Sequence, residues 1–153
     1  MKKKVFYSVA AAMLVMFLAM VAVSQPTGTH KVVFHMNTTG DYAWEQGLRN
    51  IMALQGAFGP KNVQIEVVCL GPGLKMIMKS DTRFQERIEK FAASGVVFAA
   101  CENTMRGMGV TKADLLAVDT TVPSGVAEVV KKEEAGWSYI KSGAETQIDP
   151  PTF

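Results

Sequence analysis

The chain has 153 residues, of which 48% are hydrophobic and 20% charged, and its formal net charge at pH 7 is +2. This length and composition are typical of one globular domain with its own core, and they exclude a largely disordered chain. Lys2, Lys3 and Lys4 lie at the extreme N-terminus, and without them 13 basic residues remain against 14 acidic ones, a net charge of −1. The rest of the chain therefore lacks the basic surface that a nucleic-acid partner requires.

A long apolar segment, residues 5–23, follows the three lysines and precedes polar residues and Pro26. This order of charges and apolar residues is typical of an export signal. Small residues at 22–24 would allow cleavage before Gln25, but about 18 or more apolar residues can also remain as a membrane anchor. Residues 1–24 are therefore predicted to be a signal peptide or an N-terminal anchor. Both alternatives place the remainder outside the cytoplasm, as a periplasmic, secreted or membrane-anchored protein.

The first half of the remaining chain alternates between strand-like and helix-like segments. A β-branched run at residues 31–37 predicts a strand, and apolar side chains at helical spacing predict a helix over residues 41–58. A second strand is expected at 63–70, followed by a short apolar piece at 74–78. A second amphipathic helix is expected from Asp81 to Gly95.

The second half continues the same alternation. Residues 96–101 form an unbroken apolar run, which indicates a strand covered on both faces, and a helix begins near Glu102. A short run at 115–122, a helix capped by Ser124 and a last strand at 137–140 complete the pattern. The sequence thus predicts a single α/β domain, residues 30–142, with a central, mainly parallel sheet flanked by helices in flavodoxin-related layering. Residues 143–153 are expected to be an irregular tail.

Cys101 stands between the strand at 96–101 and the helix that follows it. In an open parallel sheet, ligands bind beyond the carboxyl ends of the strands. A cysteine at a helix N-terminus is stabilised as the thiolate, and Arg106 would add positive charge one turn later. We expect a partly accessible sulfur with a lowered pKa. The alternative is a packed cysteine, because free cysteines are among the most buried residues.

Cys69 ends the preceding strand, just before Gly71, Pro72 and Gly73. It could resolve an oxidised or sulfur-loaded Cys101, but a packed role is the safer interpretation. An exported protein with two cysteines would ordinarily form a disulfide. A doubly wound order with the first strand between the two cysteine-bearing strands would separate them by about 10 Å, whereas a disulfide needs Cα atoms within about 7 Å. We therefore predict no Cys69–Cys101 bridge.

Other polar residues near the predicted strand ends are candidates for a ligand pocket. Asn37 follows the first strand, and Glu102 and Asn103 follow the third, although solvated residues at a helix start would give the same pattern. Gly-Pro-Gly at 71–73 lacks the spacing and the lysine of a phosphate-binding loop. His30 and His35 have too few neighbouring ligands for zinc or copper. No metal and no cofactor are predicted.

Three stretches resemble the DsrE/DsrF-like family of small sulfur-relay proteins: LGPGLKMI, ACENTMRGMGVTKADLL and VPSGVAEVVKKEEAGWSYIK. The resemblance extends from Lys31 to about Lys141. It implies a compact α/β fold with a central parallel sheet and assembly as a homotrimer or homohexamer. In the sulfur-relay members it also implies a cysteine at the position of Cys101 that carries sulfur as a persulfide. The relay members are cytoplasmic, so an export signal is a departure from their pattern.

The leading hypothesis is therefore an exported protein that handles reduced sulfur through Cys101, as a carrier or sulfurtransferase. Glu102, Asn103 and Arg106 would shape its pocket, and Asn37, Cys69, Gly71 and Gly73 would complete it. Its partners would be sulfur donor and acceptor proteins or small sulfur compounds. The alternative is a non-catalytic α/β module that binds a small ligand or serves in assembly, with Cys101 structural.

The N-terminal segment leads to a test of location. Because the lysines remain in the cytoplasm and the apolar segment crosses the membrane, we expect every residue after Ser24 to be extracytoplasmic. Cell fractionation of the full-length chain, with a cytoplasmic enzyme as the marker, measures this. Recovery of the uncleaved chain in the soluble cytoplasmic fraction would contradict it.

Overall fold

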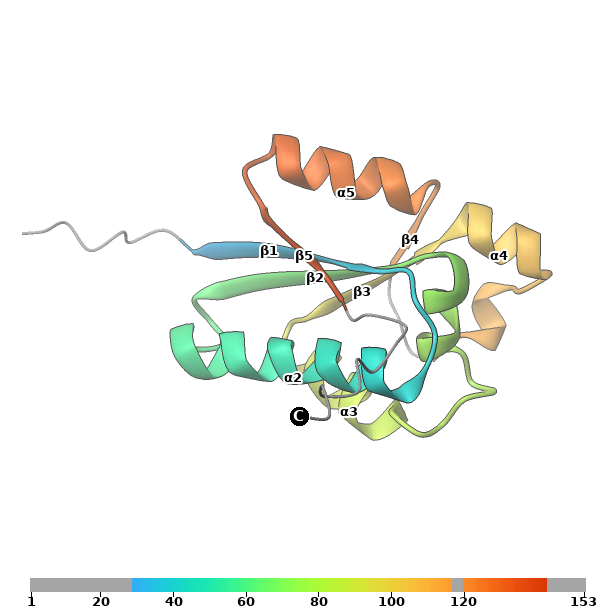
Figure 1. The fold of residues 1–153 in the computed structure, drawn as a ribbon, viewed down its shortest axis with the longest axis horizontal. Coiled ribbons are helices and arrows are strands. Elements are labelled where there is room, and N and C mark those ends of the chain that lie inside the picture. The colour runs from blue at the N-terminus through green and yellow to red at the C-terminus, as the bar shows by residue number, and fades with distance from the viewer. Residues whose placement is uncertain (1–28, 117–119, 143–153) are drawn as a thin grey trace, which may run out of the picture.

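A computed structural model of the chain describes residues 29–116 and 120–142 (Figure 1). The predicted signal or anchor at residues 1–24 and the tail at 143–153 lie outside these residues. In the part that is described, no helix is both long enough and apolar enough to cross a membrane.

Five parallel strands form one sheet with the order β4-β3-β2-β1-β5. The strands are β1 (His30–Met36), β2 (Val63–Cys69), β3 (Val97–Cys101), β4 (Thr120–Val122) and β5 (Ser138–Lys141). This is the predicted α/β class with a central parallel sheet. The first three strands lie side by side in chain order, so the expected position of the first strand between the cysteine-bearing strands is wrong.

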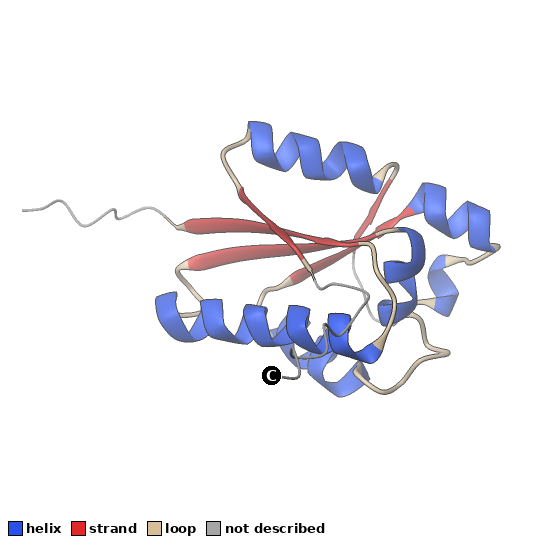
Figure 2. Ribbon diagram, in the orientation of Figure 1, coloured by secondary structure: helices blue, strands red, loops and turns tan. Residues whose placement is uncertain are grey.

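Helices cover both faces of the sheet (Figure 2). α2 and α3 lie on one face and α5 lies on the other, while α4 stands beyond the end of the sheet (Figure 1). The helices are α2 (Asp41–Phe58), α3 (Gln85–Ala93), α4 (Glu102–Met108) and α5 (Gly125–Glu134), with two 3₁₀ helices, η1 (Gly71–Ile77) and η2 (Lys112–Asp114).

Two predicted boundaries differ from the structure by more than two residues. The helix expected from Asp81 begins at Gln85, because the Asp81 carboxylate accepts hydrogen bonds from the backbone and side chain of Arg83 and holds residues 81–83 in a turn. Of the short run expected at 115–122, only Thr120–Val122 is a strand, and residues 117–119 lie outside the described part. Of the expected 74–78 segment, residues 74–77 belong to η1, and Met78 is its C-cap.

The alternation of side chains along the strands divides the core into two parts. On the face covered by α2 and α3 lies the larger part, with Phe34, Trp44 and Cys69 at its centre. The face covered by α5 has a smaller core. Its buried members are Val33, Val68, Leu70, Ala99, Cys101, Val122 and Val129.

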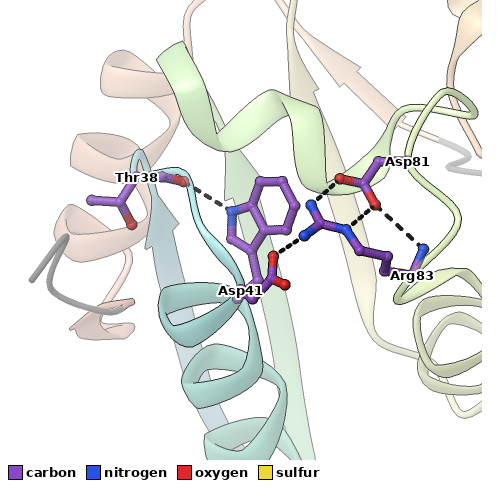
Figure 3. Close-up of polar contacts among 5 residues, drawn as sticks. Thr38, Asp41, Asp81 and Arg83 are labelled. Atoms are coloured by element: carbon purple, nitrogen blue, oxygen red, sulfur yellow. Dashed lines mark hydrogen bonds and ion pairs between the residues drawn. The ribbon is translucent and has the colours of Figure 1, made fainter. Parts of the chain in front are cut away.

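Trp44 contacts both the connection after β1 and the segment before α3. Its indole N–H donates to the carbonyl oxygen of Thr38 at 3.0 Å, and the Arg83 guanidinium lies over its ring, 5.3 Å from the centroid. Arg83 in turn binds Asp41 and Asp81 (Figure 3). This cluster fixes the chain where it leaves the carboxyl end of β1.

Several apolar side chains remain exposed on or beside the α5 face. Val126 and Val130 lie one turn apart on α5, and Tyr139 is on the adjacent edge strand β5. Their exposed fractions are 60%, 47% and 41%. The homotrimer or homohexamer implied by the resemblance stays a prediction.

Gly73 is expected to be indispensable to the fold. A Cβ at this position would lie 2.2 Å from the carbonyl oxygen of Met36, a contact with backbone that cannot move aside easily. We expect Gly73→Ala to lower the free energy of unfolding by about 3 kcal/mol or more, through strain of the kind that overpacking produces. Urea denaturation measures it.

Gly56→Ala is the matched control for this substitution. Gly56 is exposed within α2, and a Cβ there meets nothing within 4 Å. Alanine should raise stability by about 0.5–1 kcal/mol, because it has the higher helix propensity. Equal stability of the Gly73→Ala protein and the unmodified chain would show that the approach to Met36 is not a constraint.

Candidate functional site

Cys101 lies where two successive connections leave the sheet in different directions. It is the last residue of β3, it directly precedes α4, and it is paired with Val122 of β4. After β3 the chain enters α4, whose Met105 packs into the larger core, whereas after β4 it enters α5 on the opposite face. In parallel sheets this is the point where a ligand crevice forms.

The two cysteines face opposite sides of the sheet. Cys69 is paired with Ala100 on the adjacent strand, so Cys101, one residue further on, points to the other face. Both thiols are free. The alternation of side chains therefore supports the predicted absence of a Cys69–Cys101 disulfide. The two strand spacings expected from the sequence do not.

Their surroundings differ as much as their directions. Cys69 is fully buried in the larger core, and burial raises the pKa of its thiol far above the ordinary value. Cys69 is therefore a neutral, packed residue. It cannot reach Cys101 to resolve an adduct without loss of the strand geometry.

The first turn of α5 lies against the sulfur of Cys101. The backbone N–H of Gly125, the first residue of α5, donates to Sγ at 3.2 Å. The Cys101 side chain is only 4% exposed, so the expected partly accessible sulfur is wrong for this conformation. The N-terminus of α5 covers the sulfur that the sequence placed at an open strand end.

The pKa of Cys101 is lowered in spite of this burial. Burial alone raises the pKa of the thiol, but the Thr104 side chain and the backbone N–H groups of Thr104, Gly125 and Asn103 together lower it. Each of these donors binds the charged sulfur more strongly than the neutral one. The direction agrees with the sequence-based expectation, although Arg106 is not among its causes.

Gly125 allows α5 to come this close. A Cβ on Gly125 would lie 3.0 Å from Cβ of Leu70 and 3.2 Å from Cβ of Cys101. Because glycine has no Cβ, its N–H can reach the sulfur without displacing β2 or β3. The N–H of Ala127, two residues further along the helix, donates to the side chain of Ser124 at 3.4 Å, the cap that the sequence predicted.

An ion pair holds α5 on the sheet. Lys132 lies 2.5 Å from the carboxylate of Glu66, a residue of β2 that is only 5% exposed. The same ammonium group lies 4.3 Å from the centroid of the Trp137 ring. These contacts fix the helix axis and, with it, the position of the Gly125 N–H.

The other predicted site residues are only partly brought together. Glu102 accepts a hydrogen bond from the Thr121 hydroxyl at 2.7 Å, and Arg106 binds the side chain of Asn103 on the exposed side of α4. The backbone of Asn103, and not its side chain, is among the groups that lower the pKa of Cys101. Arg106 therefore shapes the surface of α4 and not the immediate environment of the thiol.

The residues after β1 and β2 have separate roles. Gly71 donates its N–H to the Thr104 hydroxyl at 2.9 Å, and Gly73 packs against the backbone of Met36. Asn37 lies beyond the end of β1, two strands from β3 and so about 10 Å away. Its buried Oδ1 has no hydrogen-bond partner in the part of the chain that is described.

Two residues at the sulfur, Thr104 and Gly125, were not predicted from the sequence. The sequence placed Gly125 at the start of the helix after Ser124. The pattern of apolar residues did not indicate which strand end that helix approaches. Thr104 carried no signal beyond its spacing of three residues from Cys101. Within the described ranges no group of three or more His, Cys, Asp or Glu side chains could hold a metal ion. The arrangement is suited to a thiolate nucleophile or leaving group.

The model of the DsrE/DsrF-like family matches residues 31–142 of the chain. No curated protein matches this chain. Among solved structures, the chain is similar to a protein of unknown function from Methanobacterium thermoautotrophicum, with 30% identity and a TM-score of 0.69. That match covers 73% of this chain and 98% of the other.

Two further structures are similar in fold alone. The ychN protein from E. coli is 13% identical, with a TM-score of 0.60, over 74% of this chain and 98% of its own. A conserved protein of unknown function from Bacteroides thetaiotaomicron is 17% identical, with a TM-score of 0.59, over 77% of this chain and 99% of its own. The five-strand parallel sheet flanked by helices is thus a fold shared with known proteins.

The contact between α5 and Cys101 leads to a test. In Gly125→Ala, the added Cβ must displace the start of α5 from Leu70 and Cys101 by a few tenths of an ångström, which lengthens the contact between the N–H and Sγ. We expect the pKa of Cys101 to rise, because one donor to the thiolate is weakened. The pH dependence of iodoacetamide alkylation at Cys101 measures this.

Gly107→Ala serves as the control. Gly107 is an exposed residue of α4, and a Cβ there meets nothing within 4 Å, so the alkylation profile should not change. A folded Gly125→Ala protein whose Cys101 titrates like that of the control would refute a role for the α5 amide.

Proposed function

Since the chain belongs to the DsrE/DsrF-like family, we propose that it receives reduced sulfur on Cys101 and passes it on. The observation that carries this proposal is the hydrogen bond from the Gly125 N–H to Cys101 Sγ, together with the lowered pKa of that thiol. A persulfide carrier needs a thiolate to accept sulfur and a stable thiolate to release it. Of the two cysteines, Cys101 alone has surroundings that favour this form.

The relay consists of two balanced exchanges. In loading, the Cys101 thiolate attacks the outer sulfur of a donor persulfide. A new S–S bond forms, the donor's S–S bond breaks, and the donor leaves as a thiolate. In unloading, an acceptor thiolate attacks the outer sulfur of the Cys101 persulfide, and the electron pair of the broken bond returns to Cys101 Sγ. Neither step needs an oxidant, because the sulfur moves between partners at the same oxidation level.

The donor is a small persulfide or polysulfide or a protein persulfide, and the acceptor is a small thiol or a protein thiol. Cys101 is buried in the resting conformation, which favours small sulfur species over a bulky partner at the loading step. With the predicted export, these partners would be extracytoplasmic. The chain then acts as a carrier or sulfurtransferase that holds one sulfur atom at a time.

A second function is favoured by one specific observation. Cys101 accepts the first N–H of α5 and is only 4% exposed, which is the geometry of a residue that caps a helix within a core. In that case the chain is a non-catalytic binding or assembly module, and Cys101 is structural. The two functions differ in whether the native protein takes up sulfur.

Uptake of sulfur is measured on the full chain. After incubation with inorganic polysulfide and removal of the excess, we expect mass spectrometry to find one additional sulfur atom on Cys101. Cys69→Ala should still take up sulfur, because Cys69 lies in the core on the other face of the sheet. Cys101→Ala should take up none.

The reversal of the adduct by a thiol reductant distinguishes a persulfide from irreversible oxidation. Native protein that stays unmodified at Cys101, while the same thiol reacts after unfolding, would identify the structural role. An adduct found on Cys69 alone would also exclude the relay.

A further inference from the structure

Three residues on one face of α5 contact the sheet. Gly125, Val129 and Lys132 are spaced by four and three residues, so they lie in one line along the helix. Gly125 donates its N–H to Sγ of Cys101, Val129 packs in the smaller core, and Lys132 binds Glu66. In α5 only Gly125 and Val129 are buried, whereas α2 buries five residues. Apolar burial therefore holds α5 on the sheet less strongly than it holds α2.

The ion pair between Lys132 and Glu66 is a second attachment of α5 to the sheet. The Glu66 carboxylate is buried, its Oε2 lies 2.5 Å from the ammonium group of Lys132, and its Oε1 has no hydrogen-bond partner in the part of the chain that is described. In that part of the chain, Lys132 is the cation that balances this charge. A buried carboxylate that loses its partner is costly, so the pair resists any movement of α5 away from β2.

Glu66 and Cys101 lie at opposite ends of the contact between α5 and the sheet. Glu66 is paired with Val97 of β3, and Cys101 is four residues further along that strand, about 13 Å away. On the helix, Gly125 and Lys132 are seven residues apart, about 10 Å along the axis. The helix therefore lies along the strands and is joined to them at both ends. The ion pair is at one end, and the hydrogen bond to the sulfur is at the other.

We propose that Glu66 and Lys132 are positioning residues for Cys101. Their ion pair keeps α5 on the sheet, so that the Gly125 N–H binds the sulfur and the first turn of the helix covers it. Without the ion pair, the sulfur loses part of a donor to its thiolate and becomes more accessible to reagents. This positioning applies to any thiol chemistry at Cys101, and its effect on sulfur loading rests on the relay proposed above.

The test uses Glu66→Gln, which keeps the shape of the side chain and removes its charge. The loss of a negative charge, acting directly, would lower the pKa of Cys101, because it favours the thiolate. Release of α5 has the opposite effect. We therefore expect the pKa of Cys101, measured from the ultraviolet absorbance of the thiolate, to rise. At a pH where Cys101 is fully ionised, iodoacetamide should label it several-fold faster, and polysulfide should load it faster as well.

Two variants serve as controls. Lys132→Arg keeps a cation that can bind the Glu66 carboxylate, so both quantities should stay near those of the unmodified chain. Glu45→Gln removes the partner of Arg87 in an ion pair between α2 and α3, on the other face of the sheet, so neither quantity should change. Urea denaturation of Glu66→Gln measures its effect on the whole fold. A loss of global stability alone would leave the pKa of Cys101 in the folded protein unchanged.

Hydrogen exchange tests the same proposal on the unmodified chain and does not depend on the folding of a variant. If the ion pair fixes the whole helix, we expect the hydrogen-bonded amides of α5, that of Gly125 included, to exchange with solvent through one common opening. Exchange of the Gly125 amide well ahead of the amides around Lys132 would show that the first turn moves independently of the ion pair. That result would overturn the proposal.

The outcomes separate this inference from the proposed function. An unchanged or lowered pKa of Cys101 in folded Glu66→Gln overturns the positioning role, whether or not the protein carries sulfur. A raised pKa with unchanged labelling also overturns it, because the two effects arise from the same movement of α5. A raised pKa and faster labelling in a protein that takes up no sulfur refute the relay and leave the positioning role established.

Discussion

The pairing register between β2 and β3 decides what each cysteine can do. Cys69 is opposite Ala100, so the sulfur of Cys101 emerges on the face that α5 covers, whereas that of Cys69 enters the larger core. A shift of one residue would exchange these faces and place Cys101 in the larger core, away from the N-terminus of α5. The electrostatic surroundings of Cys101 thus depend on a register that the hydrophobic pattern of both strands sets.

Three connections meet beside Cys101 because of the strand order. The Gly125 N–H, after β4, donates to the sulfur, and the Gly71 N–H, after β2, donates to the Thr104 hydroxyl in α4, after β3. These contacts are made by backbone N–H groups and a hydroxyl, and none brings a formal charge. A thiolate stabilised by fixed dipoles in a buried site is less sensitive to salt than one paired with an exposed arginine.

The sequence allowed the fold class and most elements to be predicted, because apolar periodicity marks strands and helices directly. It also located Cys101 at the end of β3 and Ser124 at the cap of α5. It did not allow the strand order to be predicted, since a βαβ unit reads the same whichever edge of the sheet the next strand joins. Gly125 and Thr104 were missed for this reason: their importance lies in contacts between segments that are 24 and 33 residues apart in the chain.

The sealed position of Cys69 gives the molecule an internal reporter of global opening. It belongs to the same cluster as Phe34 and Trp44, beneath α2, whereas Cys101 is covered by the first turn of α5 and pairs with a strand of three residues. Separation of the first turn of α5 from β3 would expose Cys101 while the central strands stay paired, whereas Cys69 becomes exposed only when those strands part. Exposure of Cys101 therefore reports local opening, and exposure of Cys69 reports global unfolding. The difference between these two opening free energies is the free energy that separates partial from complete unfolding.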